Sequence, residues 1–322
     1  MSEVNSENRA GSALSFVDLF CGIGGFHLAA TMACQDRGKT AQCVFASDID
    51  PDSQKAYATN FGIIPRGDIT QVDVSDIPEH DILFGGFPCQ AFSICGDRKG
   101  FEDARGTLFF EIARILSVRR PAAFVLENVK QLRGHDGGKT LSVILRSLNS
   151  IGYTVDWRIL NALNFGLPQK RERIFIVGFR EPHDFVWPAG DFPRKTLLEI
   201  LECEEDISDF YRASPKIRQS RLQKREGKKE WDEPTIWHEN KGGNISALPY
   251  SCAMRAGASY NYLLVNGERR LTEREMLRLQ GFPDEFKVVC GYHATRKQAG
   301  NSVAVSCVKA VVGSVIDALA KG

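Results

Sequence analysis

The sequence predicts an α/β protein with a doubly wound, mostly parallel sheet and a second, smaller, irregular β-rich domain. Two observations indicate the large domain. Short apolar runs typical of buried strands alternate with segments of helical periodicity, and the first run is followed by a glycine-rich turn at residues 21–25. A third observation indicates the small domain: from about residue 186 the alternation is lost and polar, irregular sequence dominates.

Composition limits the classes of protein to which the chain can belong. Its 322 residues allow one large domain or two unequal ones, and an apolar fraction of 43% suffices for a full core. The formal net charge of +1 gives no broad basic field, so a nucleic-acid partner would need a local patch. The nine cysteines form no CxxC pair and no HExxH motif occurs, so a metal site is not indicated. No apolar leader or long apolar span is found, which predicts a reduced, cytoplasmic protein.

The first two strands are expected at residues 15–20 and 43–47, and the helices that follow them at 26–33 and 50–57. A strand, a glycine-rich turn and a helix together let a backbone approach a nucleotide-like ligand and offer helix N–H groups to an anion. Because the spacing is not GxGxxG, a tight turn without any ligand remains the alternative.

Two acidic residues follow these elements. Asp48 ends the second strand, where an acid can hold ribose hydroxyls. Asp68 lies in the next loop, where its carboxylate can accept a hydrogen bond from a purine amine. Taken alone, Asp68 is better explained as a helix cap or an Asx turn.

The strand expected at residues 82–84 ends in two glycines, a phenylalanine, a proline and then Cys89. Ligands of open α/β sheets bind outside the carboxyl ends of the strands, so this thiol is placed for chemistry. Spacing alone gives about equal support to a small buried hydrophobic residue. The next strand, 123–126, ends in Glu127, whose pKa we expect burial to raise. Glu127 is therefore a candidate proton donor next to Cys89.

A long polar loop, residues 91–106, follows Cys89 and is typical of a functional lid. It contains Arg98, Lys99 and Arg105, and the first two can either meet phosphates or belong to a solvated turn.

Further elements are expected as helices at 107–118 and 141–148 and strands at 154–160 and 174–179. Arg171 and Arg173 stand two residues apart at the start of the last of these strands, so they should point the same way and could clamp an oxygen or a phosphate.

The small domain is expected at residues 186–294, with short β-like pieces that include Arg255. A capping box at 272–275 should open a helix that closes at Gly281. The last helix is expected to start near Asn301 and to pack its apolar stripe back on the N-terminal sheet, so the large domain would comprise residues 1–185 plus 295–322. That stripe consists of Val305, Val308, Val312, Val315 and Leu319.

A set of ordered blocks resembles the DNA cytosine-5 methyltransferases, especially the short bacterial enzymes of restriction–modification systems. The blocks are DLFCGIGG at 18–25, GDIT at 67–70, GGFPCQAFS at 85–93, ENV at 127–129, QKRERIFIVG at 169–178, RRLTEREMLRLQGFP at 269–283 and GNSVAV at 300–305. Each block alone is weak or moderate evidence for the family. Because the blocks occur in the same order as in that family, a chance match is very unlikely.

This resemblance implies a Rossmann-like fold that binds S-adenosylmethionine and a role for each matching residue. Cys89 would be the nucleophile, Glu127 its acidic partner, and Arg173 and Arg171 would bind the cytosine oxygen and order the site. The cofactor would be held by Phe20, Gly22, Ile23, Gly24, Asp48, Ile49, Asp68, Ile69, Leu108, Asn301 and Ser302. DNA would be contacted by Gln90, Ser93, Arg98, Lys99, Arg105 and Arg255. Arg255 would read a guanine in the major groove, and the alternatives for it are a phosphate contact or a surface charge. Three positions depart from the family pattern, because Cys21 stands for a small alanine, Asp48 for a glutamate and Ile49 for an aromatic residue.

The implied function is methyl transfer from S-adenosylmethionine to carbon 5 of a flipped-out cytosine in double-stranded DNA, through a covalent Cys89 adduct. The enzyme would be a monomer that protects DNA in a restriction–modification system, with any cognate restriction endonuclease acting separately. Two alternatives share the fold: an RNA cytosine-5 methyltransferase and a catalytically degenerate nucleic-acid-binding relative. The size of the small domain favours duplex DNA over RNA, and the presence of both Cys89 and Glu127 argues against a degenerate site. A nucleotide-dependent oxidoreductase is disfavoured because the glycine-rich turn has the wrong spacing.

Overall fold

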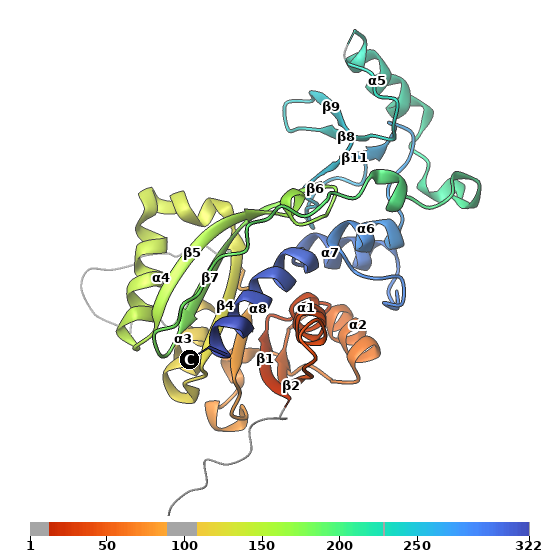
Figure 1. Ribbon diagram of the computed structural model, residues 1–322. Coiled ribbons are helices and arrows are strands. Elements are labelled where there is room, and N and C mark those ends of the chain that lie inside the picture. The colour runs from red at the N-terminus through yellow and green to blue at the C-terminus, as the bar shows by residue number, and fades with distance from the viewer. Residues whose placement is uncertain (1–12, 89–107, 228, 322) are drawn as a thin grey trace, which may run out of the picture.

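The computed structural model describes residues 13–88, 108–227 and 229–321. Its centre is a six-stranded sheet in the order β2-β1-β3-β4-β7-β5, which Figure 1 shows in the lower half of the molecule. The neighbours β2, β1, β3 and β4 pair in parallel, and β7 is antiparallel to both β4 and β5. The strands are β1 (Leu14–Leu19), β2 (Ala41–Ser47), β3 (Ile82–Gly85), β4 (Ala123–Val129), β5 (Thr154–Asn161) and β7 (Glu172–Phe179). The predicted mostly parallel sheet is therefore confirmed.

Helices cover both faces of this sheet because its strands are apolar on both sides. Along β4, Val125 belongs to one buried cluster and its neighbours Phe124 and Leu126 to the other, as the alternation of side chains across a strand requires. Figure 1 shows α1 and α8 on one side of the sheet and α3 and α4 on the other. The helices are α1 (Gly25–Gln35), α2 (Pro51–Phe61), α3 (Leu108–Arg119), α4 (Lys139–Ser150) and α8 (Val305–Leu319).

The last helix packs as expected but starts later than predicted. Val305, Val308, Val312 and Val315 are buried in the cluster that contains the residues of α1 and one face of the sheet, and each buried valine contributes about 1.5–3 kcal/mol. A separate helix, α7 (Tyr292–Asn301), ends where α8 was expected to begin. Between them the backbone is extended at Ser302, and Arg171 donates hydrogen bonds to the carbonyl oxygens of Gly300 and Ser302.

Helices α7 and α8 together form the one described stretch, Tyr292–Leu319, that is long and apolar enough to cross a membrane. Of its most apolar window, 61% is buried inside the protein, as in a core helix.

The remaining strands form small sheets away from the central one. β8 (Ile236–Glu239), β9 (Ile245–Leu248) and β11 (Leu263–Val265) make a three-stranded antiparallel sheet in the order β11-β8-β9. β10 (Ser251–Cys252) pairs in parallel with β6 (Gln169–Lys170). Figure 1 shows the three-stranded sheet and α5 (Pro215–Arg225) at the end of the molecule opposite the central sheet, with α6 (Glu273–Gln280) and α7 between them. This irregular, β-rich region agrees with the fold predicted for it.

Short 3₁₀ helices complete the described elements, at Ile69–Gln71, Val74–Asp76, Lys130–Gly138, Ala162–Asn164, Leu197–Glu199, Glu204–Asp206 and Asp209–Tyr211. The predicted capping box is present: Thr272 and Glu275 bond to each other's backbone N–H at the start of α6, and Gly281 ends the helix with a φ of 86°. Glu275 is also bound by the buried Arg269, whose Nη1 and Nη2 each lie 2.8 Å from one of its carboxylate oxygens.

Candidate active site

A cavity of about 750 Å³ opens at the carboxyl ends of the parallel strands β1 to β4. Ligands of open α/β sheets bind at this edge, and the volume lies within the range of about 300–1,000 Å³ that is usual for small-molecule sites. The elements contribute one group of residues each. These are Phe20 and Gly22 after β1, Ser47–Pro51 after β2, Gly67–Thr70 in the next loop, Gly86–Pro88 after β3, Glu127–Val129 in β4, Arg171 and Arg173 around the start of β7, and Lys297, Gln298, Gly300 and Asn301 in α7.

Three residues of the glycine-rich turn have a left-handed backbone conformation. Phe20, Gly22 and Gly24 have φ values of 55°, 53° and 86°, in the left-handed region that favours glycine. A Cβ atom at Gly24 would lie 2.1 Å from the Phe61 ring, so α1 packs against α2 only without a side chain there. Phe20 and Gly22 line the cavity, whereas Gly24 and the buried Ile23 lie outside it and support the turn.

Asp48 is held by the backbone on both sides of the cavity. Its Oδ2 accepts a hydrogen bond of 2.8 Å from the Gly22 N–H, and its Oδ1 accepts one of 2.9 Å from the Asp50 N–H. Burial raises the pKa of this carboxyl above its usual value. Asp50 in turn caps α2 by accepting from the Ser53 N–H at 2.9 Å, and its other oxygen pairs with Lys297 of α7.

Apolar and acidic groups surround the same end of the cavity. Ile69 is buried, Leu108 is half-buried, and Ile49 is 72% exposed. Asp68 forms the local cap that its sequence context favours, because its Oδ1 accepts from the Thr70 N–H at 2.9 Å, and it also lines the cavity. Apolar side chains for a flat ring, with the half-buried Asp48 and the exposed Asp68 for hydroxyl and amine groups, suit a nucleoside-like ligand.

Glu127 stands at the other end, inside β4 and not just after it as expected. It is 8% exposed, and its Oε1 lies 2.9 Å from the Nε of Arg173. Burial raises the pKa of the Glu127 carboxyl, as predicted, although Arg173 and Arg171 act in the opposite direction. The adjacent Asn128 donates a hydrogen bond of 2.8 Å to the carbonyl oxygen of Phe87, so β4 fixes the chain that follows β3.

Arg171 and Arg173 both line the cavity but have different partners. Arg171 lies outside β7 and is 2% exposed. Its guanidinium donates to the carbonyl oxygens of Met254, Gly300 and Ser302, the first two at 3.2 Å. Burial lowers the pKa of Arg171 to about 9, and the charge of Arg173 acts in the same direction. Arg171 therefore orders the backbone, whereas Arg173 binds the buried acid.

Several predicted residues do not meet in this cavity. Asn301 lines it, but Ser302 does not, and the carbonyl of Ser302 is bound by Arg171. Arg255 is exposed and lies at a separate small pocket. Cys89, Gln90, Ser93, Arg98, Lys99 and Arg105, with the whole 91–106 loop, lie outside the described residues. Pro88, the last described residue before Cys89, lines the cavity.

Sequence reasoning missed Asp50, Asn128 and Lys297, which all line the cavity. The first two follow predicted site residues directly, so their place at a strand end was an available signal. Lys297 had no such signal, because only the packing of α7 brings it to Asp50. No group of three or more His, Cys, Asp or Glu side chains suited to a metal occurs among the described residues.

Comparison with known proteins identifies the family. A sequence model of the C-5 cytosine-specific DNA methylases matches residues 14–317. The chain is 54% identical over 294 residues to the type II methyltransferase M.NgoBI of Neisseria gonorrhoeae, which covers 91% of this chain and 90% of the relative. It is 51% identical over 304 residues to M.HaeII of Haemophilus aegyptius, covering 94% and 93%.

Solved structures agree on the fold. The Dnmt2 methyltransferase of S. pombe superposes with a TM-score of 0.67 at 21% identity, over 95% of this chain and 99% of that one. The family match spans nearly all of the chain, and every sequence block except that at residues 269–283 contributes residues to the cavity at the strand ends. The chain therefore belongs to the C-5 cytosine-specific DNA methylase family and is a DNA cytosine-5 methyltransferase.

Proposed function

We propose that this enzyme methylates carbon 5 of a flipped-out cytosine in a specific double-stranded DNA sequence, with S-adenosylmethionine as methyl donor and Cys89 as nucleophile. The observation that carries the proposal is the ion pair between the buried Glu127 and Arg173, in the cavity that is also lined by Pro88, the residue before Cys89. The relatives named type II methyltransferases support a role in protecting DNA in a restriction–modification system.

The nucleoside end of the cavity fits S-adenosylmethionine, which when bound supplies a methyl group on a positively charged sulfur. Asp48 would hold the ribose hydroxyls and Asp68 the purine amine, with Phe20, Ile69 and Leu108 against the flat ring. The fit rests on the donor set in the structure: Asp48 is half-buried, has no cationic side chain bonded to it among the described residues, and lines the cavity. Asn301 and Lys297 of α7 close the same side.

Cys89 would attack carbon 6 of the cytosine ring, forming a carbon–sulfur bond and giving carbon 5 the character of an enamine. Glu127 would give its proton to ring nitrogen 3, so that the charge pushed into the ring is neutralised. Burial raises the pKa of Glu127, which favours its protonated form and suits this donor role. Carbon 5 would then take the methyl group and lose its proton to water or hydroxide. Ring nitrogen 3 would return its proton to Glu127 as the carbon–sulfur bond breaks and releases Cys89 as a thiolate.

Arg173 would hold Glu127 in place and donate to the cytosine oxygen, because its guanidinium has several N–H groups and one ion pair does not use them all. Its charge, together with that of Arg171, would favour the thiolate form of a nearby thiol. These steps need a base that has left the duplex stack, at a cost of a few kcal/mol. We assign closure over the flipped base to the 91–106 loop.

We assign duplex recognition to residues 186–294 and catalysis to residues 1–185 plus 295–322. Arg255, on the exposed segment that follows β10, is the proposed guanine or phosphate contact within the smaller part. We further propose that the enzyme acts as a cytoplasmic monomer and that any cognate endonuclease acts separately.

The proposal is tested by adduct formation and by mapping of the methylated base. Duplexes containing 5-fluorocytosine should trap a cofactor-dependent covalent complex with the wild type but not with Cys89→Ala, which should still bind S-adenosylhomocysteine. Bisulfite sequencing of DNA from a host that expresses the chain identifies the base and its sequence context. Turnover by the Cys89→Ala variant would contradict the nucleophile assignment, and labelled methyl transfer to RNA but not to duplex DNA would contradict the substrate.

A further inference from the structure

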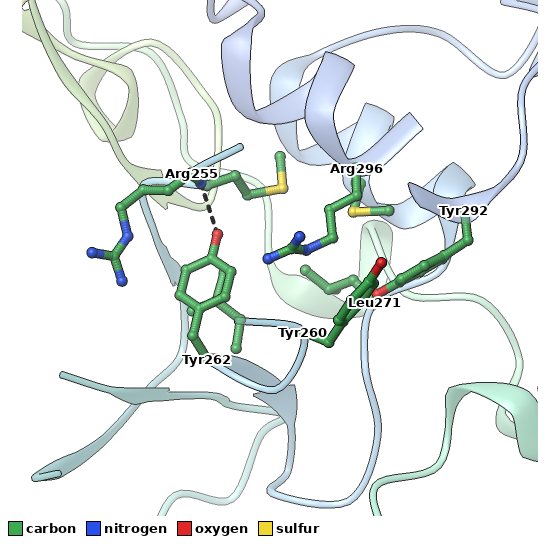
Figure 2. Close-up of a pocket in the computed structure, with 9 residues that line it drawn as sticks. Arg255, Tyr260, Tyr262, Leu271, Tyr292 and Arg296 are labelled. Atoms are coloured by element: carbon green, nitrogen blue, oxygen red, sulfur yellow. Dashed lines mark hydrogen bonds between the residues drawn. The ribbon is translucent and has the colours of Figure 1, made fainter. Parts of the chain in front are cut away.

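Helix α7 contacts two different sites with two of its faces. Lys297, Gly300 and Asn301 line the large cavity, whereas Tyr292 and Arg296 line a small pocket beside the segment of residues 254–260, which follows β10. Figure 2 shows the side chains of this pocket, with the Arg296 guanidinium pointing between the rings of Tyr260 and Tyr262. The same helix therefore adjoins both the proposed cofactor end and the segment that carries Arg255.

The start of this segment is fixed to the catalytic part of the molecule. The Met254 N–H donates to Gln169 Oε1 at 3.1 Å, and the Met254 carbonyl accepts from Arg171 at 3.2 Å. The next residues lie directly against α7: a Cβ atom at Gly300 would be 2.4 Å from the backbone nitrogen of Ala256. The backbone of residues 254–256 thus has little freedom to move.

Arg296 fixes the rest of the segment. It is 7% exposed, and its Nη2 donates to the carbonyl oxygens of Ala258 and of Ser259, the latter at 2.9 Å. Its guanidinium carbon lies 4.9 Å from the Tyr260 ring centroid and 5.7 Å from that of Tyr262, both within the range of about 6 Å for a cation–π contact. No carboxylate pairs with Arg296 in the part of the chain that the structure describes.

Arg255 and Tyr260 are the outward-facing residues of the segment. The Arg255 N–H donates to the Tyr262 hydroxyl at 2.8 Å, and its guanidinium lies 5.0 Å from the Tyr262 ring centroid, on the side opposite Arg296 (Figure 2). Tyr260 is 43% exposed, and its hydroxyl lies 2.6 Å from His293 Nδ1 on α7. The Arg255 guanidinium therefore lies against Tyr262, and Tyr260 and Tyr262 are the two rings that Arg296 contacts.

We infer that Arg296 is a positioning residue for target recognition: it holds the backbone and rings of residues 255–262 so that Arg255 and Tyr260 are presented to DNA in one arrangement. The inference rests on the proposed function. An arrangement fixed before binding avoids the entropy cost of ordering a loop on DNA. A buried guanidinium without a carboxylate partner also leaves its positive charge available to attract phosphate.

Arg296→Lys separates charge from positioning. Lysine keeps the positive charge but cannot bond two carbonyl groups and stack as a planar group. With the site mapped by bisulfite sequencing, we expect the ratio of affinities for the cognate and a scrambled duplex to fall at least about tenfold, the size of one good base contact. The dependence of binding on salt should remain, because the charge is kept. The dissociation constant for S-adenosylhomocysteine, measured by calorimetry without DNA, should stay within about twofold, because the cavity-lining face of α7 is unchanged.

Arg120→Lys is the matched control. Arg120 also donates to a backbone carbonyl, that of Ile151, and lies 5.4 Å from a tyrosine ring centroid, that of Tyr153. It precedes β4, at the end of the sheet away from the cavity. This variant should keep the affinity ratio of the wild type.

The results of these measurements either support or overturn the inference. An unchanged affinity ratio in Arg296→Lys would overturn the inference, as would an equal loss of affinity for DNA and for S-adenosylhomocysteine, which would indicate a general structural role. Should Arg296→Lys fail to fold, Tyr260→Leu decides, because this ring is partly exposed: a severalfold fall in the ratio supports the inference and no fall overturns it. A wild type that prefers no duplex at all would contradict the proposed function itself, independently of Arg296.

Discussion

The two ends of the cavity are held in different ways. At the nucleoside end, the Asp48 carboxylate is bound by the backbone N–H groups of Gly22 and Asp50. At the other end, Glu127 is positioned by the side chain of Arg173, and Arg171 holds together backbone segments from three parts of the chain. Backbone groups remain when a side chain is replaced. Substitutions should therefore affect the Glu127 end far more than the nucleoside end.

The largest effect is expected for Glu127→Gln. The amide has nearly the same shape but cannot give a proton, so kcat should fall about 10²–10⁴-fold, the usual contribution of a positioned acid. Affinities for S-adenosylhomocysteine and for duplex DNA should change little, since the cofactor contacts lie at the other end. Single-turnover methylation and equilibrium binding measure the two quantities. Equal losses of rate and of DNA affinity would contradict the proton role.

Arg171→Met should mainly destabilise the fold. Methionine fills part of the space but leaves the carbonyl oxygens of Met254, Gly300 and Ser302 without their donor. We expect the free energy of unfolding to fall by about 3–5 kcal/mol, as for other broken buried polar networks. Urea denaturation measures it, with Arg146→Met on the exposed face of α4 as a control that should stay within about 0.5 kcal/mol. A loss of activity at unchanged stability would instead place Arg171 in the chemistry.

Arg173→Met should move the pH dependence of the reaction. Burial raises the pKa of Glu127 and Arg173 lowers it, so removal of this charge should raise the pKa further. Because the acid must be protonated to act, kcat should fall as the pH rises through this pKa, and the fall should occur at higher pH in the variant. A shift of about one pH unit corresponds to about 1.4 kcal/mol. Profiles of kcat against pH at saturating DNA and cofactor test this, and a shift toward lower pH would refute the pairing.

The smallest effect is expected for Lys297→Met at the nucleoside end. The side chain of Lys297 is 51% exposed in its pair with Asp50, and exposed pairs contribute about 0–1 kcal/mol. The dissociation constant for S-adenosylhomocysteine should rise less than about fivefold. Lys309→Met, which removes a pair with Asp36 on the far side of α1, should leave it unchanged. If Lys297→Met lost a hundredfold or more of its affinity for S-adenosylhomocysteine, the nucleoside end would also depend on side chains.

The parts of the site that the sequence predicted correctly are those determined locally. Asp48 and Glu127 were expected near the ends of apolar strands, and parallel strands bring such positions to one edge of the sheet whatever the rest of the chain does. The raised pKa of Glu127 follows from the same burial. Within the glycine-rich block, sequence could not separate Phe20 and Gly22, which line the cavity, from Ile23 and Gly24, which support the turn, because that difference depends on where Phe61 and α2 pack.

The sequence by itself determined the order of strands and helices, the residue types at the strand ends and the family, because apolar periodicity and glycine requirements act over a few residues. Only the tertiary structure decided that Arg171 binds backbone while Arg173 binds Glu127, that α8 begins at Val305, and that Arg296 and Lys297 face different sites. Each of these depends on contacts between segments more than forty residues apart or on how a whole helix is oriented. Long-range contacts and the orientation of a helix cannot be read from local sequence, because the same residues could form their hydrogen bonds with other partners.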